Sequence, residues 1–148
     1  MMLVAFSLDD RAYALHLPAV ERVVRIVEVT PLPDASGIVA GVVNVRGQVI
    51  PVIDVRKRFL LPARKLHLSD QLIVARTSRR TVALIADTVT GVVECDEADV
   101  IAAEAILPGM EYVKGVAKLG NGMLLIQDLE SFLSLEEDRL LRDALSDA

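Results

Sequence analysis

Cysteine and aromatic residues are scarce in this chain, and its 16 basic residues are outnumbered by 21 acidic ones. Of its 148 residues one is cysteine, 3% are aromatic and none is tryptophan. Cys95 has no second cysteine with which to form an internal disulfide, which favours a reducing cytoplasm. The formal net charge of −5 argues against a protein that binds phosphate backbones in bulk.

Long hydrophobic runs and export signals are also missing. No apolar run reaches 18 residues, and the opening MMLVAFSLDD has no basic segment of the kind that begins a signal peptide. We therefore expect a soluble protein that is neither exported nor inserted directly into a membrane.

The side chains that carry catalysis or bind metals do not form recognisable clusters. His16 and His67 have no metal-like spacing to another histidine or cysteine, and no phosphate-binding loop or nucleophile elbow occurs. The acidic run 94–104 lacks the glycine and alternating donors of a calcium loop, so it is predicted as a solvated loop. The sequence predicts no enzyme, no cofactor and no metal.

The residues that are abundant point to strands. Hydrophobic residues make up 53% of the chain, and with so few aromatics the core has to consist of Val, Leu, Ile and Ala. Branched side chains pack well on a pleated sheet, so the composition favours a mainly β protein. A length of 148 residues suits one domain, or two small lobes that share a core.

An internal repeat organises the chain. Segment 41–59 resembles segment 115–133 at an offset of 74 residues, and segment 3–24 resembles segment 72–93 at an offset of 69. We refer to 3–24 with 41–59 as the first copy and to 72–93 with 115–133 as the second. One supersecondary design is therefore used twice, in the same order.

Short apolar runs separated by turn residues predict about ten strands, a single helical turn at 18–22, a linker at 62–69 and a C-terminal amphipathic helix pair at 129–145. Two equivalent sets of short strands indicate two small barrels rather than a parallel α/β sheet. Both arms of the hairpin at 39–45 and 48–53 are apolar on both faces, so we expect them to be buried between layers. The remaining strands are predicted at 3–8, 12–17, 23–29, 72–76, 81–86, 89–94, 112–119 and 123–127.

Residues shared by both copies are best explained by folding. Gly41 and Gly115 each stand at the entry to a strand. Gly47, which is not repeated in the second copy, completes the tight corner of the first hairpin. Asp54 and Asp128 each precede a helix-compatible stretch, where an aspartate can cap free backbone N–H groups. We predict structural roles for these five residues.

Residues found in one copy are freer to serve function. Asn44, Arg46 and Pro51 of the first copy become Lys118, Gly120 and Leu125 in the second. The planar guanidinium of Arg46, at a hairpin tip, suits an interface contact better than a core position.

The motif N-x-R-G-x-x-x-P-x-x-D-x-R at 44–56 resembles the signature of the CheW-like family of bacterial chemotaxis coupling proteins, and the resemblance extends through 83–93 and 112–119. It implies two intertwined SH3-like five-stranded barrels related by the internal repeat. It further implies one CheW-like domain over 1–148, with lobes at roughly 1–62 and 63–134 that exchange strands and a C-terminal helix or tail at 135–148.

The same resemblance implies a function. Family members are non-catalytic adaptors that join the cytoplasmic tip of methyl-accepting chemoreceptors to the regulatory domain of a CheA-type histidine kinase, and a free-standing member is expected in the cytoplasm, recruited to membrane receptor arrays. The receptor tip is expected in the groove between the barrels, as a helix in a groove. Carried over by motif, the expected receptor-sensitive positions are Val20, Gly41, Arg46 and Val92.

One departure from the family pattern bears on the site. Where the family often reads V-x-E-[IV], this chain has Val20-Glu21-Arg22-Val23, so that Arg22 takes the position of the glutamate. We hypothesise that Arg22 and Arg46 together give a more basic partner-binding surface. The full set of expected partner-binding residues is Val20, Arg22, Gly41, Asn44, Arg46 and Val92.

A second class of function is a small SH3- or OB-like module that binds nucleic acid. Basic clusters at 56–58, 64–65 and 76–80 would supply the charge. The stacking aromatics that such modules use are missing, which disfavours this alternative.

Overall fold

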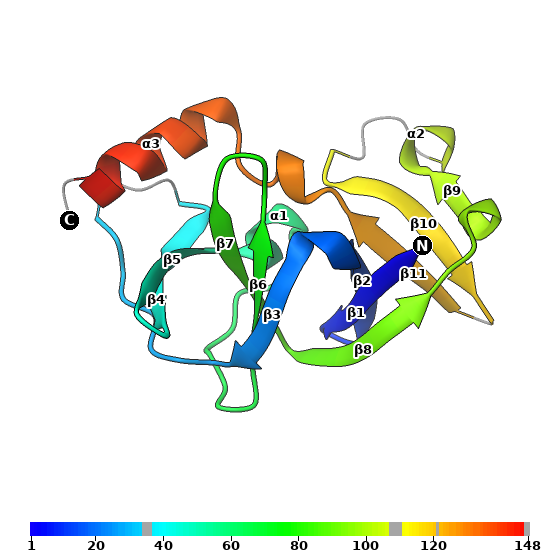
Figure 1. Cartoon of the computed structure of the whole chain (residues 1–148), viewed down its shortest axis with the longest axis horizontal. Helices are drawn as coiled ribbons and strands as arrows, with labels where there is room; N and C mark the ends of the chain where they lie inside the picture. Colours follow the sequence, from blue (N-terminus) through cyan, green and yellow to red (C-terminus); the bar gives the residue numbers. More distant parts are fainter. Residues whose placement is uncertain (34–36, 107–110, 121, 147–148) are drawn as a thin grey trace.

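Two antiparallel-rich sheets and a C-terminal helix make up the computed structural model, which describes residues 1–33, 37–106, 111–120 and 122–146 (Figure 1). Sheet A has the strand order β8-β1-β2-β11-β10-β9, and sheet B the order β3-β6-β7-β5-β4. The strands are β1 (Met2–Leu8), β2 (Arg11–His16), β3 (Val20–Arg25), β4 (Val39–Val45), β5 (Gln48–Ile53), β6 (Gln71–Arg76), β7 (Thr81–Ala86), β8 (Thr88–Glu94), β9 (Val100–Ala102), β10 (Val113–Leu119) and β11 (Gly122–Gln127).

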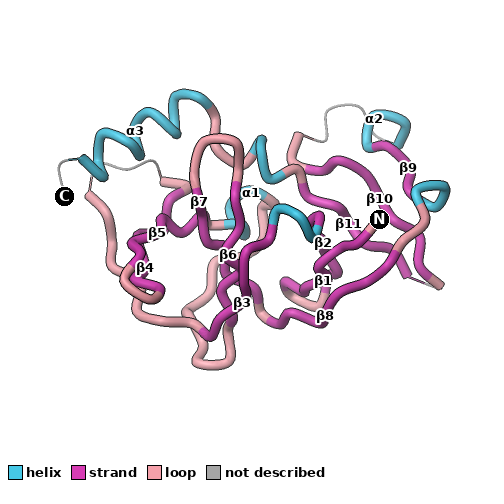
Figure 2. The backbone as a smooth tube through the Cα atoms, in the orientation of Figure 1, coloured by secondary structure: helices cyan, strands magenta, loops and turns pink. Residues whose placement is uncertain are grey.

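The helical elements are short except for the last, as Figure 2 shows. The predicted single turn near Pro18 is a 3-10 turn, and the predicted C-terminal pair is a 3-10 turn followed by a helix of 12 residues. Residues 147–148 of the predicted tail lie outside the described residues. The elements are η1 (Leu17–Ala19), α1 (Val55–Arg58), η2 (Glu97–Asp99), α2 (Ala103–Ile106), η3 (Leu129–Ser131) and α3 (Leu135–Ser146).

Neither sheet is made from a single copy of the repeat. Sheet A joins β1 and β2 to β8–β11, while sheet B joins β3–β5 to β6 and β7. The strand pairings repeat as well. The antiparallel pair β1–β8 of sheet A corresponds to the pair β6–β3 of sheet B, and the parallel pair β2–β11 of sheet A corresponds to the pair β7–β5 of sheet B. The predicted mainly β fold with two intertwined barrels is confirmed, and sheet A carries one strand, β9, beyond the five that were expected.

Glycine is needed at positions 41 and 115 for the same structural reason in the two sheets. A Cβ at Gly41 would lie 2.2 Å from the carbonyl oxygen of Thr30, and one at Gly115 would lie 2.7 Å from that of Ile101. Thr30 forms an isolated bridge to Val42, and Ile101 belongs to β9, which pairs with β10. Glycine is required because a neighbouring backbone passes directly over these positions.

Two expectations about individual strands are wrong. The acidic run 94–104 contains η2 and β9 instead of being a loop throughout, because β9 repeats the bridge that Thr30 makes in sheet B. Neither arm of the hairpin is buried on both faces along its whole length: Ala40 and Asn44 of β4 are exposed, and so is Val49 of β5. Apolar content alone did not reveal which face of these strands is turned to solvent.

Pro51 sits in β5, between two hydrogen-bonded neighbours, where proline is normally excluded. Its partner across the pair is Val42, whose N–H and C=O both bond outward to Thr30, at 2.8 and 2.9 Å. Strand β4 therefore presents no acceptor at this point of the ladder, and the missing N–H of Pro51 costs no hydrogen bond to that strand.

The core has three parts. One apolar cluster consists mainly of side chains from sheet A, including Leu3 and Ile126. A second consists of side chains from sheet B, including Ile50 and Leu72. The third and largest joins the sheets and takes side chains from both, from Leu8 of β1 to Leu141 of α3. Burial between the sheets is what holds the two barrels as one body.

All of the aromatic residues lie in the third cluster or against it. Their ring centroids follow one another at 5.2–6.4 Å, in stacked, tilted and edge-to-face arrangements that aromatic pairs favour. The few aromatic rings of the chain thus pack at the junction between the sheets. They are Phe6, Tyr13, Phe59, Tyr112 and Phe132.

Helix α3 is fixed to sheet B by polar and apolar contacts together. Arg58 of α1 pairs with Glu137 and lies 5.0 Å from the ring centroid of Tyr112, and Arg80 donates to Asp138 at 2.7 Å. Leu141 of the same helix is fully buried in the third cluster. The helix is therefore part of the fold.

The two predicted helix caps behave differently. The carboxylate of Asp54 accepts a hydrogen bond from the backbone N–H of Lys57 at 3.2 Å, as predicted for an N-cap. Asp128 stands at the matching position before η3, but its side chain makes no capping hydrogen bond. The prediction of a cap is wrong for Asp128, although a 3-10 turn does begin at that point.

Candidate partner-binding surface

The tip of the β4–β5 hairpin is a two-residue turn with a left-handed backbone. Arg46 has φ of 52° and Gly47 has φ of 86°, the pattern of a type I′ turn, which matches the twist of paired strands. The side-chain oxygen of Asn44 accepts from the N–H of Gly47 at 2.8 Å. Asn44 therefore shapes the turn that presents Arg46 to solvent.

Arg46 itself is exposed, and no hydrogen bond or ion pair ties its side chain to the described part of the chain. A non-glycine residue with positive φ is strained relative to glycine, and the matching position in sheet A is Gly120, with φ of 55°. The fold thus accepts glycine at this point and gives no structural reason for arginine.

Strand β3 carries a bulge at Glu21. Val20 pairs with Ala75 and Arg22 with Val74, so Glu21 is the extra residue. The bulge recurs in β8 at Thr90, which stands at the matching position of the second copy. The Glu21-Arg22 departure from the family pattern therefore lies at a β-bulge that is present in both copies of the repeat.

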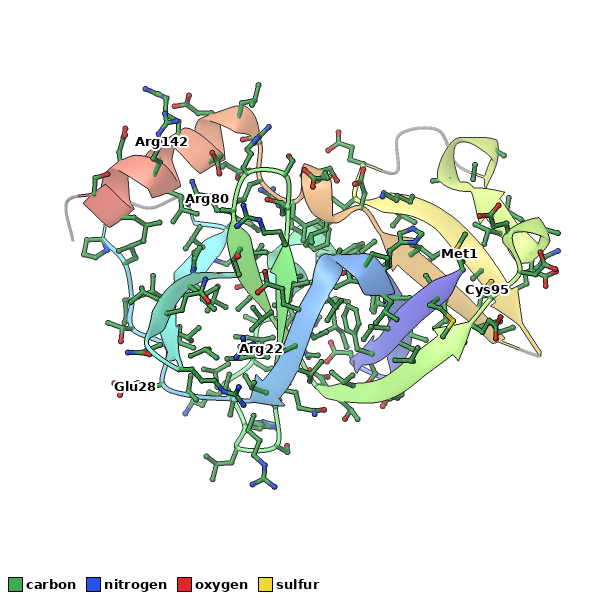
Figure 3. All side chains as sticks on the ribbon, in the orientation of Figure 1. Met1, Arg22, Glu28, Arg80, Cys95 and Arg142 are labelled. Atoms are coloured by element: carbon green, nitrogen blue, oxygen red, sulfur yellow. The ribbon has the colours of Figure 1, made fainter. Side chains whose placement is uncertain are left out.

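Both side chains at this bulge, Glu21 and Arg22, are exposed, and Arg22 has no ion pair among the described residues. Figure 3 places Arg22 on β3, near the middle of the molecule. Its guanidinium is available to a partner.

Exposed valines mark the strands on either side of the junction. Val23 of β3 is 36% exposed and Val92 of β8 is 55% exposed, and the two occupy matching positions of the repeat. Val20 is half-buried and packs against the third cluster. In Figure 1 β3 and β8 flank the region where the sheets meet.

The six expected partner-binding residues are divided among three places. Val20 and Arg22 lie on β3 and Gly41, Asn44 and Arg46 on the β4 hairpin, which are the two edges of sheet B. Val92 lies on an edge of sheet A. Gly41 is buried beneath Thr30, so packing alone predicts that a substitution there is disruptive.

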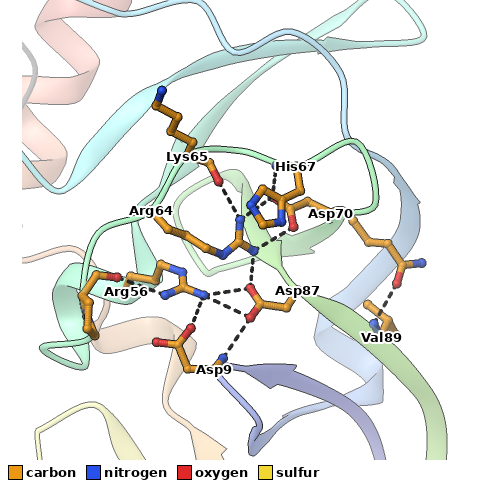
Figure 4. A network of polar contacts seen from close by, with 10 residues as sticks. Asp9, Arg56, Arg64, Lys65, His67, Asp70, Asp87 and Val89 are labelled. Carbon is orange, nitrogen blue, oxygen red and sulfur yellow. Dashed lines mark hydrogen bonds and ion pairs between the residues drawn. The ribbon is translucent and has the colours of Figure 1, made fainter.

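A polar network, which the sequence did not reveal, ties the sheets together on one side of the junction (Figure 4). Arg56 of α1 donates to Asp9 at 2.8 Å and to Asp87 at 2.9 Å. Arg64, in the predicted linker, donates to Asp70 at 2.7 Å and also pairs with Asp87. Asp9 belongs to the β1–β2 turn and Asp87 to the β7–β8 connection, so the network spans both sheets.

Every carboxylate of this network is held in its charged form. The hydrogen bond from Arg56 lowers the pKa of Asp9. Burial alone would raise the pKa of Asp70 and of Asp87, but hydrogen bonds from Arg64 and from backbone N–H groups outweigh it, so both values are lowered. The same contacts raise the pKa of Arg56 and Arg64. The network is a set of ion pairs at neutral pH.

Half of the basic residues that would have served nucleic-acid binding are engaged with acids. Arg56, Arg58, Arg64 and Arg80 are each in an ion pair, and none of the four is exposed. Arginines already held by carboxylates have fewer donors left for phosphate. This arrangement offers no support to the nucleic-acid alternative.

The residues that the structure describes contain no group of three or more His, Cys, Asp or Glu side chains placed to hold a metal ion. Their helices also include none with the length and hydropathy needed to cross a membrane.

Comparison with known proteins gives one consistent match. The model of the CheW-like domain family matches residues 2–137. The chain is 28% identical to the protein named chemotaxis protein CheW of Treponema pallidum, covering 91% of this chain and 83% of that protein, and 28% identical to its namesake of Rhizobium meliloti, covering 91% and 88%. The crystal structure of the scaffolding protein TtCheW from Thermoanaerobacter tengcongensis superposes with a TM-score of 0.81 at 29% identity, over 92% of this chain and 89% of that one.

Proposed function

Because the chain belongs to the CheW-like domain family of chemotaxis scaffold proteins, we propose that it is a non-catalytic adaptor that couples the cytoplasmic tips of methyl-accepting chemoreceptors to the regulatory domain of a CheA-type histidine kinase. It would act in the cytoplasm, recruited to membrane receptor arrays. Its partners are therefore proteins, and its output is the activity of the kinase.

The observation that carries the proposal is the pair of exposed valines, Val23 and Val92, at matching positions of β3 and β8. Other large apolar side chains are exposed as well, including the matching pair Val49 and Met123. Val23 and Val92 differ from that pair because they lie on β3 and β8, the strands on either side of the junction. An amphipathic helix such as a receptor tip docks by laying an apolar face against such residues.

The charged part of the surface completes the proposal. Arg46 stands at a hairpin tip and Arg22 at a bulge, both exposed and both without an acid partner among the described residues. Arginine contributes to interfaces through bidentate bonds to carboxylates. We infer that they contact acidic residues of the partner.

The test is reconstitution of kinase activation from receptor, kinase and this protein. Val92→Asp is expected to weaken receptor-tip binding by about tenfold or more, because it places a charge in an apolar contact, while binding of the kinase regulatory domain is kept. Leu140→Asp on α3 is the control, since Leu140 is exposed but lies outside the matched region 2–137. Kinase activation that does not depend on this protein, or receptor binding untouched by Val92→Asp, would refute the proposal.

A further inference from the structure

A small pocket opens where β2, β10 and β11 of sheet A meet the end of β6 of sheet B. Its volume is about 80 Å³. A single water molecule needs roughly 10–15 Å³ by the same kind of measure, so the pocket has room for a group of several heavy atoms. Five of the residues that line it carry polar side chains: His16, Arg76, Lys114, Gln127 and Glu130.

The internal repeat supplies a built-in comparison for this pocket. Three of its residues, Lys114, Gln127 and His16, have counterparts in a larger pocket of about 330 Å³ at the matching end of sheet B. Those counterparts are all apolar: Ala40, Ile53 and Ile85. The same barrel end is thus built without a polar side chain at any of the three positions, and the fold gives no reason for polar ones in sheet A.

Gln127 is the most telling of the three. Its side chain is 1% exposed, and neither its amide nitrogen nor its amide oxygen has a hydrogen-bond partner in the described structure. A buried amide without a partner is destabilising, and isoleucine, as Ile53 in the other sheet, would avoid that cost. An unsatisfied buried group of this kind indicates a ligand that satisfies it.

The charges around Gln127 indicate the sign of that ligand. Lys114 and Arg76 are exposed and have no carboxylate within 4 Å among the described residues; Arg76 has only a long contact of 3.3 Å to Thr81. Glu130 is the one acidic side chain of the lining, and its two oxygens already accept from the N–H and the hydroxyl of Ser78, both at 2.7 Å.

His16 adds a neutral polar group. The pKa of this imidazole is lowered, first by burial and second by the charge of Lys114. The uncharged form is therefore favoured at pH 7. The pocket therefore offers two free cations, an imidazole and an unpaired amide.

We propose that this pocket binds a carboxylate group, with the amide nitrogen of Gln127 donating to one oxygen while Lys114 and Arg76 balance the charge. A carboxylate is small, planar and able to accept from several donors at once, which suits the amide nitrogen and the two cations. The amide oxygen of Gln127 cannot bond to it and needs a separate donor. Its source is either a free small carboxylate or the acidic side chain of a protein partner.

The test follows the side-chain amide signals of Gln127 by NMR while acetate replaces chloride at constant ionic strength. Saturable shifts are expected, and the pKa of His16 should rise on binding because a neighbouring anion favours the imidazolium. Lys114→Gln is expected to weaken binding by about tenfold, since it removes a charge-assisted bond. Lys118→Gln, an exposed lysine of the same strand that does not line the pocket, is the matched control and should change nothing.

Gln127→Ile is expected to abolish binding, as read from the His16 ring signals, in a chain that still folds, because it copies the residue of sheet B. Titration with blocked aspartate (N-acetyl-aspartate amide) separates the two sources: binding as tight as that of acetate supports a partner side chain, and binding of acetate alone supports a free carboxylate. Absence of saturable shifts with both probes, or equal shifts in Gln127→Ile, would overturn the proposal. Neither receptor nor kinase is needed, so the result is independent of the adaptor role.

Discussion

Gln127 occupies in sheet A the position that Ile53 occupies in sheet B, and the two side chains are 1% and 0% exposed. Replacing Gln127 by Ile is therefore expected to raise the free energy of unfolding by about 1–3 kcal/mol, because it removes a buried amide with no partner. Urea denaturation in a carboxylate-free buffer measures the change. The reverse variant, Ile53→Gln, should be destabilised, and a Gln127→Ile chain no more stable than wild type would contradict the account.

The close approach of Thr30 predicts that Gly41→Ala is the most damaging of the glycine substitutions. A Cβ would lie 2.2 Å from the Thr30 carbonyl oxygen at Gly41 but 2.7 Å from that of Ile101 at Gly115. Since the backbone itself must move, we expect losses of roughly 2–4 kcal/mol for Gly41→Ala and less for Gly115→Ala. Gly37→Ala, with open space around it, is the control. Thermal unfolding ranks the three, and equal losses at Gly41 and Gly37 would show the contact to be unimportant.

The two aspartates at the matching helix starts should respond unequally. Asp54→Ala removes a hydrogen bond to the Lys57 N–H and is expected to cost about 0.5–2 kcal/mol. Asp128→Ala removes no such bond and should cost less than about 0.5 kcal/mol. Chemical denaturation of both variants makes the comparison. If Asp128→Ala proved the more damaging, the assignment of caps would be wrong.

The network at the sheet junction predicts acid sensitivity. Asp9, Asp70 and Asp87 have lowered pKa values when folded, so their stabilising effect is complete above the ordinary carboxyl pKa and is lost as pH falls through the lower folded values. The free energy of unfolding should be level near pH 6 and fall steadily below about pH 4.

Asp70→Asn tests one member of the network, because this buried carboxylate pairs with Arg64. A loss of about 1.5–3 kcal/mol is expected at pH 7, with a shallower decline in acid than the wild-type protein shows. Glu136→Gln, which alters an exposed pair within α3, should leave the pH profile unchanged. Parallel profiles for Asp70→Asn and wild type would exclude the carboxylate as a source of the acid sensitivity.

Arg46→Gly separates partner binding from stability. Glycine relieves the left-handed strain at this turn, so the free energy of unfolding should be unchanged or rise by up to about 1 kcal/mol. Under the proposed function, binding to a receptor tip should nevertheless fall, and Arg22→Glu should weaken it as well. Paired denaturation and pulldown experiments provide both readouts, and a glycine variant that binds the receptor tip as well as wild type would remove Arg46 from the interface.

Most of the fold was predictable because the repeat and the apolar runs are local signals. The strands, the 3-10 turn near Pro18 and the cap at Asp54 all follow from short-range patterns of this kind. The edge position of β4 and the existence of β9 could not be predicted, since both depend on which backbone passes beside Gly41 or Gly115. That information lies in tertiary contacts between residues distant in sequence.

The candidate site was predictable in part for the same reason. Comparison of the two copies singled out Arg46, which the structure leaves exposed, but it grouped Arg46 with Asn44, whose side chain shapes the turn. The pocket around Gln127 was missed, although the substitution of Ile53 by Gln127 was visible in the aligned repeat. The exchange matters because the side chain of Gln127 is buried, and that burial depends on the packing of β2, β10 and β11, which the sequence did not show.

The exchange of strands between the copies also governs the order in which the molecule can be completed. Strands β1 and β2 leave the ribosome first, yet sheet A needs β8, β10 and β11 from the second half of the chain. The amino group of Met1 bonds to the carbonyl of Cys95, a separation of 94 residues. Pairings this far apart raise the contact order and the loop-closure entropy of folding. Sheet A can therefore close only after β11 has been made, whereas every strand of sheet B is present once Ala86 has been added.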